Sequence, residues 1–248
     1  MKGETQSAIS RFFQLLQLSK RQLLIISAIV SFTLALLGAG RTMAKSPTLP
    51  EDIQGYWAQQ CVNYIVGQGI MKTYPDGTFR PNLPVTRGKF ADIIVRAFPD
   101  APVVLNYNQD YFVDIPNGYW ATAAIRKAFE TNFLAGYPDR IFAPLQNIPR
   151  VQVIVAIASG FNYTQPFQPT EALLQDTFID AQDIPGYAKD YVAAAVENRV
   201  VVKFPNPRQL DSQQWATRGD IAASLCQTKA SPSIIPQEYV VAPGMGSG

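Results

Sequence analysis

Arginine recurs at equivalent positions in three parts of this 248-residue chain, as Arg87, Arg150 and Arg218. A guanidinium group presents a planar fork of N–H donors that matches a carboxylate. Each arginine also lies beside the predicted start of a helix, and helix N-termini favour anions. These residues could therefore bind an anionic group. The alternative is a structural role, although such an arginine would still have donors to spare.

Histidine is absent from the chain. This absence excludes Ser-His-Asp and Cys-His catalysis and every zinc site that needs imidazole. An enzyme with paired carboxylates needs no histidine, but no acidic pair stands out. We therefore expect a noncatalytic protein with no cofactor and no metal site.

The charge is distributed unevenly along the chain. The first 44 residues hold five of the 21 basic and one of the 19 acidic residues, so residues 45–248 have a net charge of −2. A nucleic-acid-binding surface needs clustered positive charge in the folded part. No nucleic-acid partner is expected.

A pattern of aspartate, Gly-Tyr, aromatic-Pro turn and arginine is repeated three times. In the first copy these parts are Asp52, residues 55–57, residues 74–77 and Arg87. In the second copy they are Asp114, residues 118–120, residues 137–140 and Arg150. In the third copy they are Asp180, residues 186–188, residues 204–207 and Arg218. The spacings from Trp57 to Arg87, from Trp120 to Arg150 and from Ala188 to Arg218 are all 30 positions. Such regularity indicates internal repeats.

Each repeat contains two predicted helices joined by a loop rich in turn residues. Apolar residues after each Gly-Tyr pair recur at helical spacing, as at Cys61, Val62 and Ile65. Thr86 and Thr217 are suitable N-caps for the second helices, and Asp220 could complete a capping box. One such unit cannot bury its apolar face alone, so three units should pack around a shared core.

The N-terminal region predicts export. Residues 23–39 are uncharged, with Lys20 and Arg21 before them and Arg41 after them. A helix of this length would span roughly 25 Å, between a signal sequence and a membrane span. Both a signal peptide cleaved after Ala44 and an uncleaved membrane anchor remain open, and each would export residues 45–248.

The repeated pattern resembles the S-layer homology (SLH) repeat, over roughly residues 50–230 and most strongly at residues 52–98. Tyr-Pro-Asp-Gly-Thr-Phe at 74–79 and Thr86-Arg87 carry the resemblance. It implies a mainly α fold, a pseudo-threefold bundle of three helix-loop-helix repeats with loop prongs. The uncharged residues 23–39 predict a hydrophobic helix before this bundle. It also implies grooves between repeats that bind cell-wall polysaccharide, often bearing acidic groups.

The expected organisation combines the repeats with the composition of the two ends of the sequence. It comprises a signal peptide or membrane anchor at 1–44, a linker at 45–50, SLH repeats at 51–110, 111–175 and 176–230, and a disordered tail at 231–248. Pro99–Asp110 and Thr164–Gln175 are expected to be surface loops between repeats. Cys61 and Cys226 are expected to be buried thiols rather than a disulfide, although export and a closed ring could bring them together.

The resemblance implies a polysaccharide-binding role for residues of all three repeats. The candidates are Asp52, Trp57, Asp76, Gly77, Arg87, Asp114, Trp120, Arg150 and Arg218. The alternatives are a core position for each tryptophan, and helix capping or a salt bridge to arginine for each aspartate.

Departures from the SLH pattern predict which groove between repeats binds polysaccharide best. The third repeat has Ala188 in place of tryptophan and Phe-Pro-Asn-Pro in place of the turn. We expect the groove that uses Arg87 to bind best and the third repeat mainly to close the bundle.

The expected location is the periplasm or cell envelope, with the membrane as a second partner if the N-terminal segment at 1–44 is retained as an anchor. The alternative function is an envelope protein-interaction or assembly module that has lost sugar binding.

Overall fold

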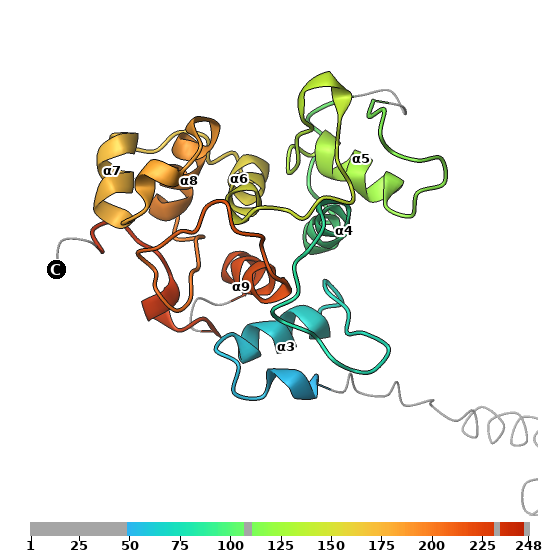
Figure 1. Ribbon diagram of the computed structural model, residues 1–248, viewed down its shortest axis with the longest axis horizontal. Coiled ribbons are helices and arrows are strands. Elements are labelled where there is room, and N and C mark those ends of the chain that lie inside the picture. The colour runs from blue at the N-terminus through green and yellow to red at the C-terminus, as the bar shows by residue number, and fades with distance from the viewer. Residues whose placement is uncertain (1–48, 107–110, 231–233, 246–248) are drawn as a thin grey trace, which may run out of the picture. The chain divides into compact units, whose positions relative to one another are not determined.

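The computed structural model describes residues 49–106, 111–230 and 234–245 (Figure 1). This part of the chain is mainly α-helical, with seven α-helices, several short 3-10 turns and no β-strand. The predicted mainly α fold class is therefore confirmed. The predicted signal peptide or membrane anchor at 1–44 lies outside the described residues. Among the described helices, none has the length and apolar character to cross a membrane.

Six of the α-helices form three pairs. The first segment has α3 (Gln59–Gly67) and α4 (Arg87–Ala97), the second has α5 (Thr122–Glu130) and α6 (Arg150–Gly160), and the third has α8 (Lys189–Glu197) and α9 (Arg218–Lys229). Thr86 caps α4 by accepting from the Lys89 amide, and Thr217 forms a capping box with Asp220 at α9. The predicted N-caps are confirmed.

The helix pairs pack across segments in a cyclic order. Helix α4 packs against α5, α6 against α8, and α9 against α3 (Figure 1). Each second helix therefore contacts the first helix of another segment. The last of these contacts joins the third segment back to the first and closes the ring.

Three backbone hydrogen bonds mark the centre of this ring. The Val85 amide donates to the Ala216 carbonyl (3.1 Å), the Ala216 amide to the Ile148 carbonyl (2.8 Å), and the Ile148 amide to the Val85 carbonyl (2.9 Å). All three residues are buried and each lies two positions before its segment's arginine. The three segments therefore meet in a pseudo-threefold arrangement.

The connection between the second and third segments differs from the prediction. The second half of the expected surface loop at 164–175 is helical, because helix α7 (Thr170–Thr177) begins within it. Leu173 and Leu174 are buried, and α7 packs against α8. This apolar pair explains why the segment is helical rather than an exposed loop. Residues 99–106 of the other connection are irregular, as expected.

The C-terminal region also differs from the prediction of a disordered tail. Its described part, residues 234–245, includes the 3-10 turn η6 (Gln237–Tyr239) and the buried residues Ile235, Val240 and Val241. The Lys203 amide donates to the Tyr239 carbonyl and the Val241 amide to the Val201 carbonyl, both at 2.9 Å. These bonds and apolar contacts hold the segment against the third segment's loop.

Cys61 and Cys226 form a disulfide, so the expectation of two buried thiols is wrong. Cys61 lies on α3 and Cys226 on α9, and their Cα atoms are 5.5 Å apart. Their separation of 165 residues hid the pairing in the sequence. Closure of the ring brings the two helices into contact and makes the bond possible.

Removing this disulfide should destabilise the ring. The double variant Cys61→Ala/Cys226→Ala is expected to lose about 3–5 kcal/mol of unfolding free energy, because the bond closes a long loop in the unfolded chain. Urea denaturation of the oxidised protein and of the variant measures this difference. Equal stabilities, together with two thiols that alkylate in the unfolded protein without reductant, would show that the bond does not form.

Candidate functional site

The three repeated arginines are buried and bond mainly to backbone carbonyls. Their exposed fractions are 3% for Arg87, 6% for Arg150 and 4% for Arg218. Arg87 Nε donates to the Phe142 carbonyl (2.8 Å), Nη2 to the Ala135 carbonyl (2.8 Å) and Nη1 to Gln152 Oε1 (2.6 Å). The guanidinium of the first segment thus holds the loop of the second.

The other two arginines repeat this arrangement around the ring. Arg150 Nε donates to the Leu210 carbonyl and Nη2 to the Val202 carbonyl, in the third segment's loop. Arg218 Nε donates to the Phe79 carbonyl (2.6 Å) and Nη2 to the Lys72 carbonyl (2.7 Å), in the first segment's loop. Each arginine therefore connects its own helix to the loop of another segment.

The repeated aspartates hold the same loops from within their own segments. The Asp52 carboxylate accepts from the Phe79 and Arg80 amides at 2.8 and 2.6 Å. The corresponding pairs of amides are those of Phe142 and Ala143 for Asp114, and of Leu210 and Asp211 for Asp180. In each segment one aspartate fixes the loop whose carbonyl then accepts from a neighbouring arginine.

The charges of the three arginines are balanced differently. Arg150 Nη1 lies 2.6 Å from Asp220 Oδ1 on α9. Neither Arg87 nor Arg218 has such an ion pair within the described residues. Burial lowers the pKa of both Arg87 and Arg218 because it disfavours the charged form. An external anion could therefore interact favourably with either of these two charges.

A cavity of about 420 Å³ lies beside Arg87, and we call it the Arg87 cavity. Its lining comes from the start of α4, the loop of the second segment, helix α6 and the start of the third segment: Arg87, Asn132, Phe133, Leu134, Ala135, Gly136, Tyr137, Pro138, Gln152, Val155, Ala156, Ser159, Tyr187 and Tyr191. The Arg87 guanidinium carbon lies 4.5 Å from the centre of the Tyr137 ring. The cavity thus combines aromatic faces, neutral hydrogen-bonding groups and one cation.

The position of Tyr187 in this cavity has a steric explanation. In the other two segments the equivalent tyrosines each lie over a glycine. Tyr56 lies over Gly219, where an added Cβ would come within 2.1 Å of the tyrosine Oη. Tyr119 lies over Gly88, where the corresponding distance would be 2.8 Å. The third equivalent of these glycines is Val151, a buried residue. Its side chain occupies that space, and Tyr187 instead lines the Arg87 cavity together with Gln152.

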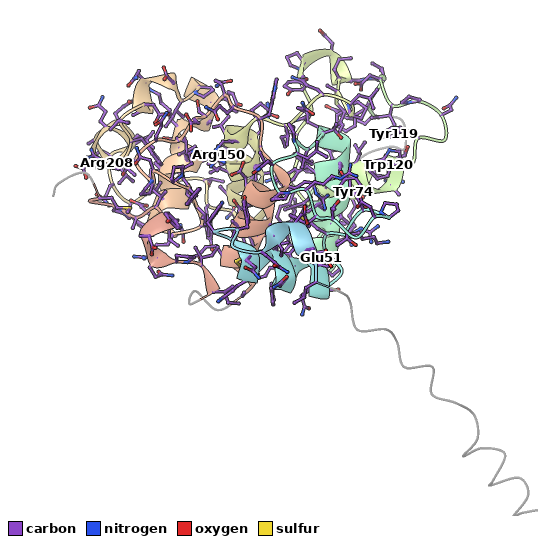
Figure 2. All side chains as sticks on the ribbon, turned by 60° about the horizontal axis from the view of Figure 1, so that its bottom comes forward. Glu51, Tyr74, Tyr119, Trp120, Arg150 and Arg208 are labelled. Atoms are coloured by element: carbon purple, nitrogen blue, oxygen red, sulfur yellow. A yellow bond between two sulfur atoms is a disulfide. The ribbon has the colours of Figure 1, made fainter. Side chains whose placement is uncertain are left out.

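A second cavity, of about 330 Å³, lies beside Asp114 and Tyr119. Its other lining residues are Pro116, Ala143, Pro144, Leu145 and Gln146. Trp120 is next to Tyr119, is 59% exposed, and lies under the Lys89 ammonium at 5.3 Å from its ring centre. Figure 2 shows Tyr119 and Trp120 projecting beside each other. Trp120 therefore does not occupy the core position that was the alternative to a binding role.

Trp57 has a different environment from Trp120. Its ring stacks on Phe204 with a centroid distance of 5.1 Å and an interplanar angle of 4°, and Tyr239 packs edge-on at 5.6 Å.

Asp76 and Gly77 form the expected turn: Asp76 Oδ1 accepts from the Thr78 amide, Oδ2 lies 2.7 Å from Arg80 Nη2, and Gly77 has φ of +84°. Thr78 and Arg80 lower the pKa of Asp76 by hydrogen bonding.

The nine predicted residues thus do not gather in one site. Arg87 lines one cavity and Asp114 lines another, whereas Asp52 and Asp76 bond within their own segment. The sequence-based prediction missed Tyr137, Gln152, Tyr187 and Tyr191. Tyr137 and Tyr187 belong to the repeated motif and could have been selected, whereas Gln152 and Tyr191 have no distinguishing signal in the sequence.

Comparison with known proteins identifies the class of part of this fold. Residues 51–91 and 111–153 match the model of the S-layer homology domain. The SLH resemblance is therefore confirmed for the first and second segments.

The chain is also similar to parts of much longer surface proteins. It is 30% identical over 131 residues to cell surface glycoprotein 1 of Acetivibrio thermocellus, covering 49% of this chain and 6% of that protein. The cellulosome-anchoring protein of the same bacterium is 39% identical over 71 residues, 29% of this chain and 15% of that protein. Outer membrane protein SlpA of Deinococcus radiodurans is 35% identical over 82 residues, 31% of this chain and 7% of that protein.

The buried arginine bonds predict that Arg87→Ala is a stability variant. The substitution leaves two buried carbonyls without their donor and removes one of two donors to Gln152 Oε1, and we expect a loss of about 2–4 kcal/mol of unfolding free energy. Urea denaturation measures the loss. Arg126→Ala is the matched control, because Arg126 forms an exposed pair with Glu130 and should change stability by less than about 1 kcal/mol. Equal losses would contradict the proposed structural bonds.

The Arg150–Asp220 pair predicts a loss of stability in acid. Burial opposes ionisation of Asp220, but Arg150 and the Thr217 hydrogen bonds keep its pKa below 3.8. A carboxylate whose pKa is lower in the folded state stabilises above its unfolded pKa, and this stabilisation disappears as the pH falls through the folded value. Urea denaturation from pH 6 to pH 2 should show a shallower pH dependence for Asp220→Asn than for the native protein. An unchanged slope, with exposed Asp176→Asn as control, would contradict this role.

Proposed function

We propose that this chain is an exported, noncatalytic attachment module of the cell envelope, and that it binds acidic, peptidoglycan-linked cell-wall polysaccharide. The matches to the S-layer homology domain support this proposal, as do the surface, anchoring and outer-membrane names of the relatives. The single observation that carries it further is the Arg87 cavity, where a buried cation without an internal carboxylate lies beside aromatic and neutral polar groups.

We also propose that residues 176–230 are a third, diverged SLH repeat. Asp180 holds its loop as Asp52 and Asp114 hold theirs, and Arg218 occupies the position of Arg87. The third segment completes both the central hydrogen-bond ring and the cyclic packing of helices. Val151 replaces the glycine, and Ala188 the tryptophan, of the other two segments. These replacements would then explain why the space beside the repeated arginine differs between segments.

The Arg87 cavity suggests how an acidic sugar would bind. Arg87 Nε, Nη1 and Nη2 already donate to protein acceptors, so its main contribution would be the positive potential of a poorly solvated charge. Direct contacts would come from Tyr187 and Tyr191, whose rings offer faces to a sugar and whose hydroxyls can hydrogen bond. The buried arginine would thus favour a carboxylate without contacting it through all its donors.

Export is supported by the disulfide, because such bonds persist mainly in oxidising compartments. We propose that the predicted leader carries residues 45–248 across the membrane, as a cleaved signal or as an anchor that makes the membrane a second partner. N-terminal sequencing of the mature protein distinguishes the two, because cleavage after Ala44 would place Lys45 first.

One feature favours protein docking as the second candidate function. Phe167 is 94% exposed, and the amides of Phe167 and Gln168 both donate to the Glu197 carboxylate at 2.8 and 2.9 Å. Glu197 therefore fixes the loop that presents this aromatic side chain. An exposed, rigidly held phenylalanine is the kind of residue that anchors a protein interface.

Binding to purified cell walls tests the two candidates. Tyr187 and Trp120 are both 59% exposed, so Tyr187→Ala and Trp120→Ala remove similarly accessible aromatic rings. We expect Tyr187→Ala to weaken binding to polymer-bearing peptidoglycan roughly 10-fold, about 1.4 kcal/mol, with a smaller effect for Trp120→Ala. Phe167→Ala should leave wall binding unchanged.

The comparison wall is peptidoglycan from which the attached polymer has been removed. The native chain should bind it far more weakly if polysaccharide is the ligand. Equal binding to both walls, or an equal effect of Tyr187→Ala and Phe167→Ala, would contradict attachment through the Arg87 cavity. Circular dichroism of each variant establishes that the differences arise in the folded protein.

A further inference from the structure

We propose that Cys61 and Cys226 are oxidised while the ring is still open between its third and first segments, and that closure of the ring then seals the disulfide from external thiols. The place of oxidation, outside the cytoplasm, rests on the proposed function, whereas the order of the two steps does not. Two observations support this order: both cysteines are buried, and both of their helices lie at one junction of the ring.

Neither cysteine is accessible in the closed ring. The exposed fraction of each is 0%, and both belong to a hydrophobic cluster that contains residues of the first and third segments, such as Ile65 and Leu225. Thiol–disulfide exchange requires an external sulfur atom to reach the protein sulfur and form a mixed disulfide with it. An external oxidant or thiol therefore cannot react with either cysteine while α3 and α9 are packed together.

The disulfide lies at the junction between segments that are not consecutive in the chain. Cys61 is on α3 and Cys226 on α9, and these two helices pack against each other (Figure 1). The other two junctions each join consecutive segments, and loosening one of them does not by itself separate the cysteines. Separation of the third segment from the first, by contrast, uncovers both sulfur atoms.

Before oxidation, this junction depends on noncovalent contacts. Among them, Lys229 Nζ donates to the Ala97 carbonyl (2.6 Å), Tyr64 Oη donates to the Lys229 carbonyl (3.3 Å), and Arg218 Nε donates to the Phe79 carbonyl (2.6 Å). These contacts break when α9 leaves the first segment, and such local openings occur in proteins without global unfolding. The disulfide then takes the place of the connecting loop that the other two junctions have.

The oxidation consists of two exchange steps. In the open ring, the thiolate of one cysteine attacks an external disulfide, such as oxidised glutathione, forms a mixed disulfide and releases one thiol of the oxidant. Closure brings the other cysteine to this mixed disulfide, and its thiolate attacks the protein sulfur, forms the Cys61–Cys226 bond and expels the second thiol. Two electrons thus pass from the protein thiols to the disulfide of the oxidant, whose two sulfur atoms leave with the two protons.

Reduction of the native disulfide tests the order of the steps, because it reverses the oxidation and passes through the same mixed disulfide. Dithiothreitol is added to the native protein without denaturant, and the released thiols are counted by alkylation and mass spectrometry. We expect reduction to be at least about 100-fold slower than in the same chain unfolded in guanidinium chloride, because the ring must first open. Similar rates in the native and unfolded chains would mean that the closed ring does not protect the disulfide, and the proposal would fail.

A matched pair of lysine variants identifies the junction that opens. Lys229 on α9 donates to the Ala97 carbonyl, and Lys127 on α5 donates to the Pro99 carbonyl. Both lysines bond to the chain near the end of α4, but Lys229 belongs to the third segment and Lys127 to the second. Lys229→Ala should accelerate reduction about fivefold, the effect of losing one hydrogen bond, whereas Lys127→Ala should change the rate less than about twofold.

Urea denaturation of both lysine variants separates local opening from global unfolding. If the acceleration follows the loss of unfolding free energy in both, the disulfide is reached by global unfolding and the proposal is wrong. If neither lysine variant changes the rate, Arg218→Lys and Arg87→Lys repeat the comparison with larger contacts, since Arg218 binds the loop of the first segment and Arg87 that of the second. Faster reduction in Arg218→Lys supports the proposal, and equal rates in this second pair overturn it. None of these outcomes affects polysaccharide binding, which the cell-wall assays test separately.

Discussion

The buried arginines make each segment depend on another. A loop carbonyl in one segment accepts from an arginine whose helix belongs to a different segment, as Phe142 accepts from Arg87. An aspartate of the loop's own segment fixes the adjacent amides, so the loop is held from both sides. Because a buried guanidinium without acceptors is costly, no segment could bury its arginine alone. In the ring of three, each of these arginines has its acceptors in another segment.

Much of this organisation could be predicted from the sequence, because it depends on local patterns. Helix periodicity, the caps at Thr86 and Thr217 and the 30-residue spacing to each arginine all arise within a segment. The partners of the arginines could not be predicted, since their acceptors are mainly backbone carbonyls, which leave no mark on residue type. The Cys61–Cys226 disulfide and the buried C-terminal segment were missed for a related reason, since both depend on closure of the ring.

Differences between equivalent positions give the three arginines different properties. The residue two positions after each arginine is Lys89, Gln152 or Asp220. Gln152 lies against Arg87 and Asp220 against Arg150, so the Arg87 charge contacts a neutral amide and the Arg150 charge is paired with a carboxylate. Lys89 pairs instead with Asp92 and lies over Trp120. A repeated arginine therefore does not imply a repeated binding site, because the neighbouring side chain determines the local charge.

Chain connectivity explains where the fold departs most from threefold symmetry. The first and second segments are consecutive, as are the second and third, but no connecting loop links the third to the first. Additional interactions occur at this junction: the disulfide joins α9 to α3, Lys229 Nζ donates to the Ala97 carbonyl, and Tyr239 packs on Trp57. The same C-terminal segment pairs with Val202, whose carbonyl accepts from Arg150. The additional packing thus occurs at the junction that no connecting loop joins, whereas consecutive segments line the Arg87 cavity.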